Sequence, residues 1–451
     1  MRKKITFIGA GSTIFIKNII GDIFQFESLY DCKIALMDID ETRLKQSERV
    51  VKNLISSKKV KASIDTFDDQ RKALIDSNFV VVAFQIGGYK PCTITDFEIP
   101  KKYGLRQTIG DSLGIGGIMR GLRTVPYLWK LCEDMKQVCP EAFLLQYVNP
   151  MAINTWAIGE RYPEIRQIGL CHSVQGTSEE LAVDLGVKVS DLRYKVAGIN
   201  HMAFYLELSS KQPDGSFKDM YPKLFKDYKD GKIPKRPGAN TRCFDFVRYE
   251  FMKHFGYFVT ESSEHFSEYV PWFIKAHRPD LISDFGIPLD EYPKRCEEQI
   301  SEWLDDAKAL EVGKNINHKT SHEYAASIMN ALITGEQCNV YGNVVNRGYI
   351  AQLPEKAAVE VECIIDKNGI QPQIVKNMPI SLIALIRSNI NVQELVVDAL
   401  LKKNRNSVYH AAMLDPHTAA ELDLNEIRNM VDELISEHGN WMPQWLQKKK
   451  K

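Results

Sequence analysis

The first 150 residues alternate short apolar runs, rich in β-branched side chains, with amphipathic stretches, and this alternation constrains the fold more than any other feature. Residues 5–8, 33–39 and 78–85 are expected to form strands, and Asp40 to cap a helix ending near residue 57. Later strands are expected at 142–147 and 167–170. Strands that alternate with helices predict an α/β fold built on a parallel, doubly wound sheet of Rossmann type.

A glycine-bearing turn follows the first of these strands. Gly9-Ala10-Gly11-Ser12 closes the strand and opens a predicted helix over residues 14–24. Glycine lets the backbone approach a pyrophosphate, and the helix start supplies N–H donors, so Gly9, Gly11 and Ser12 are expected to bind a dinucleotide. Ile14 occupies the position of the third glycine of the usual fingerprint, which weakens the match taken alone.

Acidic residues at the end of the second strand indicate which dinucleotide is bound. Asp38 and Asp40 lie where a carboxylate would meet a ribose diol, which favours NAD over its 2′-phosphorylated form. Asp38 is preferred over Asp40 as the ribose partner; the alternative is that Asp40 merely caps the next helix and Asp38 is solvated. The third strand ends in Gln85-Ile86-Gly87-Gly88, and Gln85 and Gly87 are expected to border the nicotinamide or the substrate. The alternative is an ordinary loop after a strand.

The pattern changes beyond about residue 200, where a strand at 204–208 and helices at 240–254, 290–311 and 321–334 are expected. We therefore expect a Rossmann-like NAD-binding domain over residues 1–195. An α+β lobe for catalysis and oligomerisation is expected over residues 196–451, without a flexible linker.

Composition excludes several classes of partner. The 58 basic residues equal the 58 acidic residues, so the chain carries no overall field for nucleic acid or an anionic membrane. The N-terminus has no signal-peptide pattern, and no stretch approaches the roughly 18 apolar residues of a membrane helix. Nine scattered cysteines fit a reducing compartment, so we expect a cytoplasmic protein.

Two potential metal ligands follow apolar runs. Cys171 comes directly after the strand expected at 167–170, and His201 closes the apolar stretch 196–199. A thiolate and an imidazole can both hold a divalent metal, and two ligands suit an open site that substrate hydroxyls complete. Spacing alone favours the alternative of a buried cysteine and a hydrogen-bonded core histidine.

Five ordered motifs give the chain a family resemblance: Gly9-Ala10-Gly11-Ser12, Gly116-Gly117-Ile118-Met119-Arg120, Asn149-Pro150-Met151, Cys171-His172-Ser173-Val174 and Asn200-His201-Met202. Together they resemble glycoside hydrolase family four, the NAD- and manganese-dependent glycosidases, over essentially the whole chain. The resemblance implies Mn²⁺ held by Cys171 and His201, and His172 as proton donor to the leaving group. It also implies substrate contacts from Asn149 and Asp111.

The tetrad that begins at Cys171 resembles the α-galactosidase branch, since the 6-phospho-glycosidases carry Cys-Asn-x-Pro instead. The implied activity is hydrolysis of α-galactosides such as melibiose. Ordinary glycosidases use two carboxylates and have no role for NAD, so the cofactor implies a redox route. The implied steps are C3 oxidation by NAD⁺, C2 deprotonation, elimination of the leaving group and addition of water. The C2 base aligns ambiguously within residues 261–269, where Glu264, His265 and Tyr269 are all candidates.

Three other functions stay open. An α-galacturonidase would share the tetrad but needs a cation near C6, for which Arg120, Arg123 and Lys275 are candidates. A 2-hydroxy acid dehydrogenase would share the nucleotide lobe and release stoichiometric NADH. A catalytically idle NAD-binding sensor would not need Cys171. For the preferred enzyme we expect a small-molecule substrate and a homo-oligomer.

Overall fold

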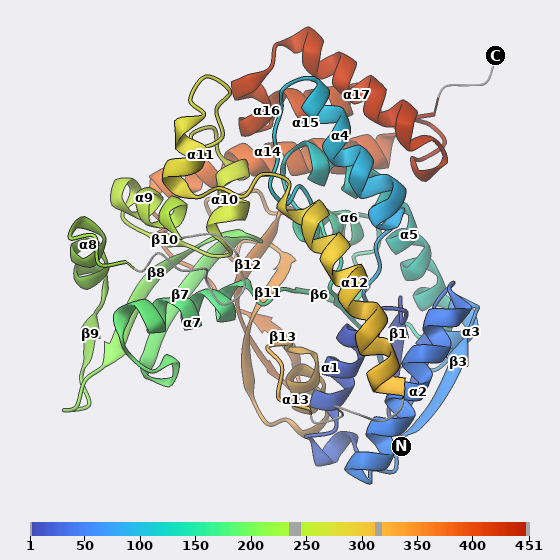
Figure 1. The fold of residues 1–451 in the computed structure, drawn as a ribbon. Helices are drawn as coiled ribbons and strands as arrows, with labels where there is room; N and C mark the ends of the chain where they lie inside the picture. Colours follow the sequence, from blue (N-terminus) through green and yellow to red (C-terminus); the bar gives the residue numbers. More distant parts are fainter. Residues whose placement is uncertain (1, 234–244, 312–317, 448–451) are drawn as a thin grey trace.

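The computed structural model describes residues 2–233, 245–311 and 318–447. Thirteen strands within these ranges form a single sheet, in the order β10-β8-β7-β12-β11-β6-β5-β4-β1-β2-β3, with β13 beside β12 and β9 beside β8. The sheet is parallel at one end and antiparallel at the other, and Figure 1 shows the two parts meeting near β6 and β11.

The parallel part confirms the expected fold class. Its strand order, β3-β2-β1-β4-β5-β6, is that of a Rossmann sheet. The strands are β1 (Lys4–Ile8), β2 (Lys33–Met37), β3 (Ser63–Phe67), β4 (Phe79–Val82), β5 (Phe143–Gln146) and β6 (Arg166–Leu170).

The antiparallel part extends the same sheet. Strand β11 pairs with β6 through Gly342 and Asn343, and β12 then pairs with β7. Because β11 runs antiparallel to β6, the sheet changes direction there without a break. The strands are β7 (Leu192–Ile199), β8 (Met202–Lys211), β9 (Phe217–Asp219), β10 (Phe258–Val259), β11 (Cys338–Val345), β12 (Ala358–Asp366) and β13 (Gly369–Pro372). The proposed domain boundary at residue 195 falls inside β7, so two domains divided there would share one sheet.

Helices cover the parallel part because each presents one apolar stripe to it. In α1 the buried positions include Ile16, Ile19, Ile20 and Ile23, spaced three or four residues apart. The helices of this part are α1 (Thr13–Ile23), α2 (Glu41–Lys58), α3 (Gln70–Leu74), α4 (Ile94–Lys102), α5 (Gly114–Val138), α6 (Met151–Arg161) and α7 (Ser173–Leu185).

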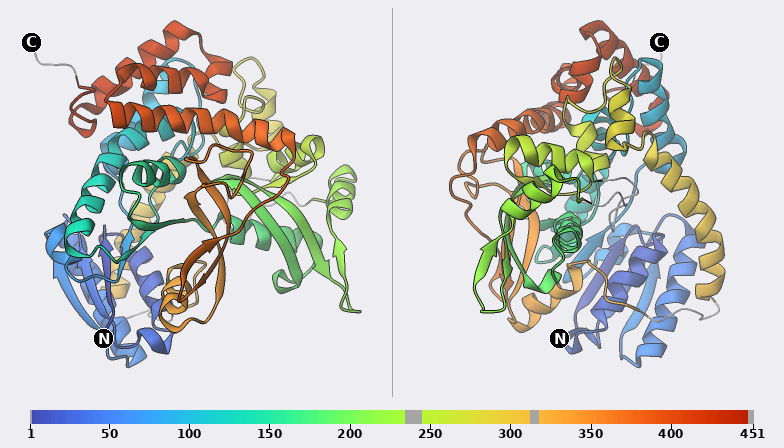
Figure 2. Two further views of the ribbon diagram at one scale, coloured as in Figure 1. Left: turned by 180° about the vertical axis from the view of Figure 1, so that it is seen from behind. Right: turned by 60° about the vertical axis from the view of Figure 1, so that its left-hand side comes forward.

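The later helices pack around both parts, and Figures 1 and 2 show α14 to α17 lying across the top of the molecule over α5 and α6. They are α8 (Tyr221–Lys229), α9 (Phe246–Phe255), α10 (Ser263–Tyr269), α11 (Asp280–Phe285), α12 (Glu291–Glu311), α13 (Ala325–Thr334), α14 (Ile380–Lys402), α15 (Arg405–Leu414), α16 (Pro416–Glu421) and α17 (Leu424–His438). The helix expected at 240–254 begins at Phe246; residues 240–244 lie outside the described residues.

Helix α14 is long and apolar enough to cross a membrane, although the sequence was predicted to contain no such segment. Half of its most apolar window is buried inside the protein, through residues such as Ile386, Ile390 and Val396. A core helix of a globular protein has the same character, and the packing of α14 on α5, α6 and α15 fits that explanation.

A buried ion network ties the last helix to the parallel part. Asp96 of α4 pairs with Arg123 of α5 and accepts a 2.8 Å contact from Nε2 of His438 in α17. All three side chains are at most 3% exposed. Arg123 Nε also donates to the carbonyl of Ile86 at 3.2 Å, so the same network supports the turn that follows β4.

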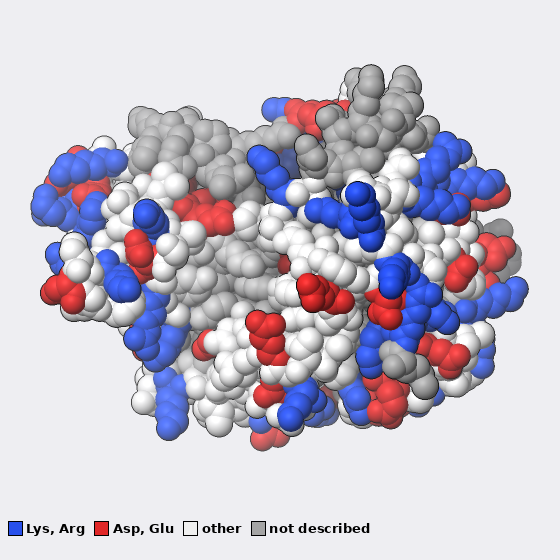
Figure 3. Space-filling model, turned by 90° about the horizontal axis from the view of Figure 1, so that it is seen from below, with Lys and Arg blue, Asp and Glu red and all other residues white. Residues whose placement is uncertain are grey.

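Acidic and basic side chains are interspersed on the face shown in Figure 3, in keeping with the equal numbers of the two signs. This face carries no broad region of one sign among the residues drawn in colour.

Candidate active site

The glycine turn lies tightly against two neighbouring strands. The N–H groups of Gly9 and Ala10 both donate to the carbonyl of Met37 at the end of β2, at 3.0 and 2.9 Å. Gly9 has a φ of 87°, and a Cβ there would lie 2.1 Å from the carbonyl oxygen of Ala83. Only glycine fits at this position, so the turn has the close backbone packing that a dinucleotide-binding loop requires.

Asp38 and Asp40 have different roles in the fold. The Asp38 carboxylate accepts the N–H of Gly11 at 2.6 Å and that of Asp40 at 2.9 Å. Asp40 instead caps α2, since its side chain accepts from the N–H of Arg43 at 3.0 Å. The Ser12 side chain makes no capping bond to α1 among the described residues, which leaves the N–H groups of that first turn available to an anion.

Gln85 and Gly87 lie in the turn after β4. The Gln85 side chain donates to Oγ1 of Thr93 at 2.8 Å and accepts from the hydroxyl of Tyr292 at 3.3 Å. Gly87 has a φ of 79°, and a Cβ there would lie 2.1 Å from Sγ of Cys92. The turn is therefore fixed by contacts from Cys92 and Thr93, just before α4, and from Tyr292 of α12.

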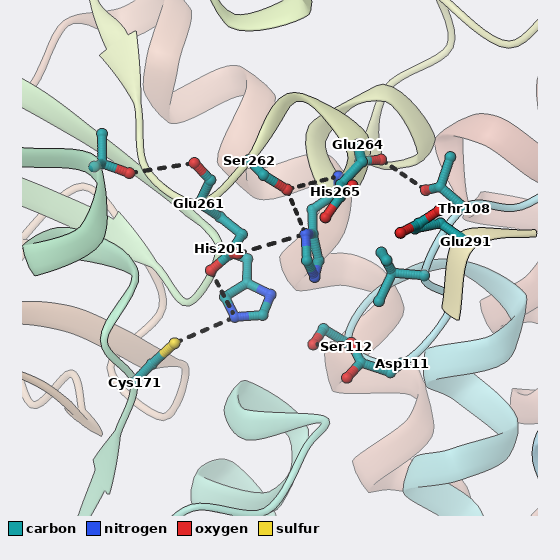
Figure 4. A network of polar contacts seen from close by, with 12 residues as sticks. Thr108, Asp111, Ser112, Cys171, His201, Glu261, Ser262, Glu264, His265 and Glu291 are labelled. Carbon is teal, nitrogen blue, oxygen red and sulfur yellow. Dashed lines mark hydrogen bonds and ion pairs between the residues drawn. The ribbon is translucent and has the colours of Figure 1, made fainter. Parts of the chain in front are cut away.

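Cys171 and His201 come together with a carboxylate that the sequence did not single out (Figure 4). Sγ of Cys171 lies 3.3 Å from Nε2 of His201, and Oε2 of Glu261 lies 3.4 Å from the same nitrogen. One donor atom from each of the three lies within 4.8 Å of the others. Cys171 follows β6, His201 lies in the turn between β7 and β8, and Glu261 follows β10.

The charges of this cluster suit a cation. Burial, aided by the carboxylates of Glu261 and Glu360, raises the pKa of the Cys171 thiol far above its usual range. Glu360 of β12 is fully buried, and its Oε2 has no hydrogen-bond partner among the described residues. Burial raises the pKa of Glu360 to about 8. A bound divalent cation would replace these protons and stabilise the ionised forms, and thiolate, imidazole and carboxylate are all metal ligands, so the residues fit a metal site.

The opposite edge of the His201 ring faces the predicted base and substrate residues. Nδ1 of His201 lies 3.2 Å from the hydroxyl of Tyr269, and the rings of His201 and His265 meet edge to face at 5.1 Å. Oxygen or nitrogen atoms of Asp111, His201 and His265 lie within 4.8 Å of one another. Asn149 donates to Oδ2 of Asp111 at 3.0 Å. The described structure thus gathers these five side chains in one place.

Electrostatics separate the two candidate bases from the acid beside them. Burial lowers the pKa of His265 to about 4, so its ring is neutral at pH 7. Burial, followed by the nearby carboxylates of Glu268, Asp111 and Glu261, raises the pKa of the Tyr269 hydroxyl. Burial opposes ionisation of Asp111, but Arg120, His265 and His201 outweigh it and hold the pKa of that carboxyl below its usual value.

Two of the predicted catalytic residues lie apart from this cluster. Glu264 is fully buried and forms an ion pair with Arg295. His172 begins α7 with a half-exposed side chain, and its Nδ1 lies 3.8 Å from a carboxylate oxygen of Glu323. A solvent-facing imidazole beside a carboxylate suits a group that exchanges protons with a leaving group and with water.

Sequence reasoning missed Glu261 and Glu360. Glu261 opens the stretch in which the base was sought, but nothing in its spacing distinguishes it from Glu264. Glu261 has a φ of 68° and His201 a φ of 63°, both in the left-handed region. Such strained conformations are common at functional sites, but neither can be read from the sequence. Glu360 gave no signal, since it lies in a strand that reaches the site only through tertiary pairing.

Fold and site together define a Rossmann-type enzyme architecture whose strand ends carry residues that could hold a metal. The family model described as family 4 glycosyl hydrolase matches residues 4–187, and that of the family 4 glycosyl hydrolase C-terminal domain matches residues 196–418. The chain belongs to the family 4 glycosyl hydrolases.

Two relatives illustrate this membership, and one solved structure shares the fold. The chain is 46% identical to the alpha-galactosidase of Bacillus subtilis (strain 168), covering 98% of this chain and 100% of that protein. It is 31% identical to the alpha-galactosidase of Rhizobium meliloti (strain 1021), covering 98% and 89%. The structure of a 6-phospho-alpha-glucosidase from gut microorganisms, in complex with NAD and Mn²⁺, superimposes with a TM-score of 0.82 at 21% identity, covering 99% and 100%. The last likeness is one of fold.

Proposed function

We propose that this protein is an α-galactosidase that uses NAD⁺ and Mn²⁺ and cleaves α-galactosides such as melibiose. The observation that carries the proposal is the Cys171–His201 contact of 3.3 Å in a chain whose glycine turn has the packing of a dinucleotide site. The 46% identity to an alpha-galactosidase over 98% of the chain supports the choice of sugar.

We assign the cofactor to the turn formed by Gly9, Gly11 and Ser12, with Asp38 meeting the ribose and Gln85 and Gly87 bordering the nicotinamide. Asp40 is then a helix cap, because Arg43 N–H occupies its carboxylate. When bound, NAD⁺ would accept and return hydride at C3 of the sugar while the metal acted as a Lewis acid on the C3 oxygen.

We assign substrate binding to Asn149 and Asp111, which are joined at 3.0 Å, with Asp111 close to His201 and His265. A carboxylate and an amide can hold two adjacent hydroxyls of a sugar in fixed directions, which orients C2 and C3 toward the metal ligands. Buried Arg120, 3.8 Å from Asp111, keeps that carboxylate ionised so that it accepts from a hydroxyl.

His265 and Tyr269 are the side chains best situated to remove the C2 proton. His265 is a neutral ring whose Nδ1 meets Ser262 at 2.7 Å and Glu261 at 3.4 Å, which leaves Nε2 to accept a proton. The hydroxyl of Tyr269 forms a 3.2 Å hydrogen bond with Nδ1 of His201. Glu264 is a weaker candidate, since Arg295 holds its carboxylate away from the cluster. His172, beside Glu323, would protonate the leaving group.

The rival α-galacturonidase needs a free cation for the substrate carboxylate. Arg123 is fully buried against Asp96, and Lys275 pairs with Glu421 at 3.1 Å. Arg120 alone of the three faces the substrate residues, and Asp111 already offsets its charge. The arrangement favours a neutral sugar, and a panel of 4-nitrophenyl α-galactoside and α-galacturonide decides between them.

The main test measures hydrolysis of the α-galactoside with NAD⁺, Mn²⁺ and a thiol reductant each present or omitted, in deuterated water. We expect activity only with all three, no net NADH, and deuterium at C2 of the released galactose. Galactose without a C2 label would refute the elimination route. Stoichiometric release of NADH would instead indicate a dehydrogenase. Loss of labelling in Tyr269→Phe but not in His265→Ala, or the reverse, identifies the base.

We further propose a cytoplasmic enzyme that assembles as a homo-oligomer. The eight cysteines of the described ranges are all free thiols, which suits a reducing compartment and a metal site that needs a thiolate. Light scattering coupled to gel filtration measures the mass of the assembly against the 51.5 kDa chain.

A further inference from the structure

The Cys171–His201 pair has a carboxylate neighbour whose position suggests more than an ion pair. Oε2 of Glu261 lies 3.4 Å from Nε2 of His201, and Sγ of Cys171 lies 3.3 Å from the same nitrogen. We infer that Glu261 is a third protein ligand of the divalent metal, held in place by Arg248. The inference rests on the proposed function for the presence of the metal, and goes beyond it in the ligand set.

Hydrogen bonding alone does not account for the arrangement. Nε2 of an imidazole carries at most one proton, yet two electron-rich atoms approach it, sulfur at 3.3 Å and oxygen at 3.4 Å, and the oxygen lies beyond the usual 2.7–3.2 Å of an N–H···O bond. Nδ1 of the same ring is engaged by Tyr269. A metal bonded at about 2.0–2.3 Å to each of three donors separates them by roughly 3–4 Å, which matches these contacts. A cation between the three atoms satisfies all of them together.

The backbone of Glu261 is fixed in a conformation it would not adopt unaided. Its φ of 68° lies in the left-handed region, which a residue with a Cβ reaches at a cost of about 1–2 kcal/mol. Its carbonyl oxygen accepts from a guanidinium nitrogen of Arg248 and from Oγ1 of Thr177 at 3.2 Å. The next residue, Ser262, caps α10. The contacts to the carbonyl of Glu261 and the cap at Ser262 together hold this strained conformation, in which the Glu261 side chain points toward His201 (Figure 4).

Arg248 is itself immobilised. The residue is completely buried, and Nε and Nη2 bind the Asp245 carboxylate at 2.5 and 2.6 Å. Nη2 also pairs with Glu180. Removing a guanidinium and two carboxylates from water costs free energy, and here the buried guanidinium binds the carbonyl of Glu261. We therefore assign Arg248 a positioning role: it acts on the metal through Glu261 and touches neither substrate nor cofactor.

A carboxylate also improves the match to manganese. Thiolate and imidazole ligands favour softer metals such as zinc, whereas carboxylate oxygens suit Mn²⁺. One sulfur, one nitrogen and one oxygen from the protein leave open positions on a six-coordinate ion. Those positions can take the hydroxyl and carbonyl oxygens of the sugar. Glu261 therefore biases the site toward the harder metal without closing it to substrate.

The test measures metal affinity rather than turnover. Mn²⁺ is titrated into the intact protein by calorimetry, with free Mn²⁺ followed by electron paramagnetic resonance. We expect Glu261→Gln to weaken Mn²⁺ binding by at least tenfold, since loss of even an outer partner of a metal ligand costs about 10–100-fold. Glu261→Asp should retain part of the affinity, and NAD⁺ affinity should be unchanged in both. Zn²⁺ affinity should fall less than Mn²⁺ affinity.

Glu264→Gln is the matched control, since it removes a buried carboxylate three residues away that faces Arg295. It should bind Mn²⁺ like the wild type. Arg248→Lys should weaken Mn²⁺ binding in a background of wild-type Glu261 and have no further effect on Glu261→Gln. Wild-type affinity in Glu261→Gln overturns the inference and leaves the proposed function standing. Equal loss of NAD⁺ affinity also overturns it, because the change would then be general. Absence of Mn²⁺ binding in the wild type refutes the proposed function itself.

Discussion

Replacing Gly9 with alanine tests whether the close packing of the first turn serves the cofactor. Gly9 has a φ of 87°, and an added Cβ would lie 2.1 Å from the carbonyl oxygen of Ala83. Gly215, in the exposed turn between β8 and β9, offers a matched control. Its φ is 86°, and an added Cβ there meets nothing within 4 Å. The two substitutions share their backbone strain and differ in the clash.

The expected magnitudes follow from those two terms. Alanine in the left-handed region costs about 1–2 kcal/mol at either position. At Gly9 the turn must also move by about 0.9 Å, the difference between 2.1 Å and the 3.0 Å below which real Cβ contacts are essentially never found. That movement strains the two hydrogen bonds to Met37 and costs roughly 1–3 kcal/mol more, as overpacking usually does. If cofactor binding must restore the turn, NAD⁺ affinity falls roughly 5- to 150-fold.

The assay pairs thermal unfolding with NAD⁺ titration by calorimetry on both variants. We expect both to lose stability, with Gly9→Ala losing more, and only Gly9→Ala to lose NAD⁺ affinity. A Gly9→Ala protein that binds NAD⁺ as tightly as Gly215→Ala would refute the reasoning, since the turn could then shift without cost to the cofactor.

Three further variants test separate features of the structure. Asp96→Asn should cost about 3–5 kcal/mol in urea unfolding, because it leaves the buried Arg123 uncompensated. Burial opposes ionisation of Asp96, but Arg123 and His438 outweigh it and hold the pKa of Asp96 below 3.8. The stability advantage of the wild type is therefore present above pH 3.8, and it is lost as the pH falls through the lower pKa of Asp96 in the folded protein. Gly21→Ala should cost about 1–3 kcal/mol, since its Cβ would lie 2.5 Å from the His318 ring, and the added change His318→Ala should recover most of that loss. Cys171→Ser should abolish Mn²⁺-dependent hydrolysis with NAD⁺ affinity unchanged; retained Mn²⁺ affinity in calorimetry would assign Cys171 to the core instead.

Most of the parallel sheet could be predicted because its strands are local and apolar. Residues 5–8, 33–39 and 78–85 each overlap an observed strand, although the second strand ends at Met37 and so frees Asp38 for the turn. Strand β3 escaped notice because it lies at the edge of the sheet and is nowhere fully buried, so its Ser-Ile-Asp-Thr-Phe sequence lacks a continuous apolar run. The single continuous sheet was not predictable, since β6 pairs with a strand more than 160 residues later.

Parts of the site were predictable for a similar reason. Cys171 and His201 are 30 residues apart, and each stands where an apolar run stops, so both could be expected at a sheet edge. Glu261, Glu264 and His265 lie within five residues, and their separation depends on where α10 begins and on a left-handed residue before it. Sequence spacing cannot tell which of two nearby glutamates faces the metal ligands and which faces Arg295.

The site lies where the sheet changes from parallel to antiparallel, and this location explains why its residues come from distant segments. Gly169 of β6, Asn343 of β11, Glu360 of β12 and Gly198 of β7 stand side by side across the sheet. Cys171 lies two residues after Gly169, just past the end of β6, and His201 lies three residues after Gly198, just past the end of β7. A one-residue slip between β6 and β11 would turn Asn343 and Glu360 to the opposite face and part them from the site. The register of the junction, more than any local motif, therefore determines whether the thiol, the imidazole and the buried carboxylates meet.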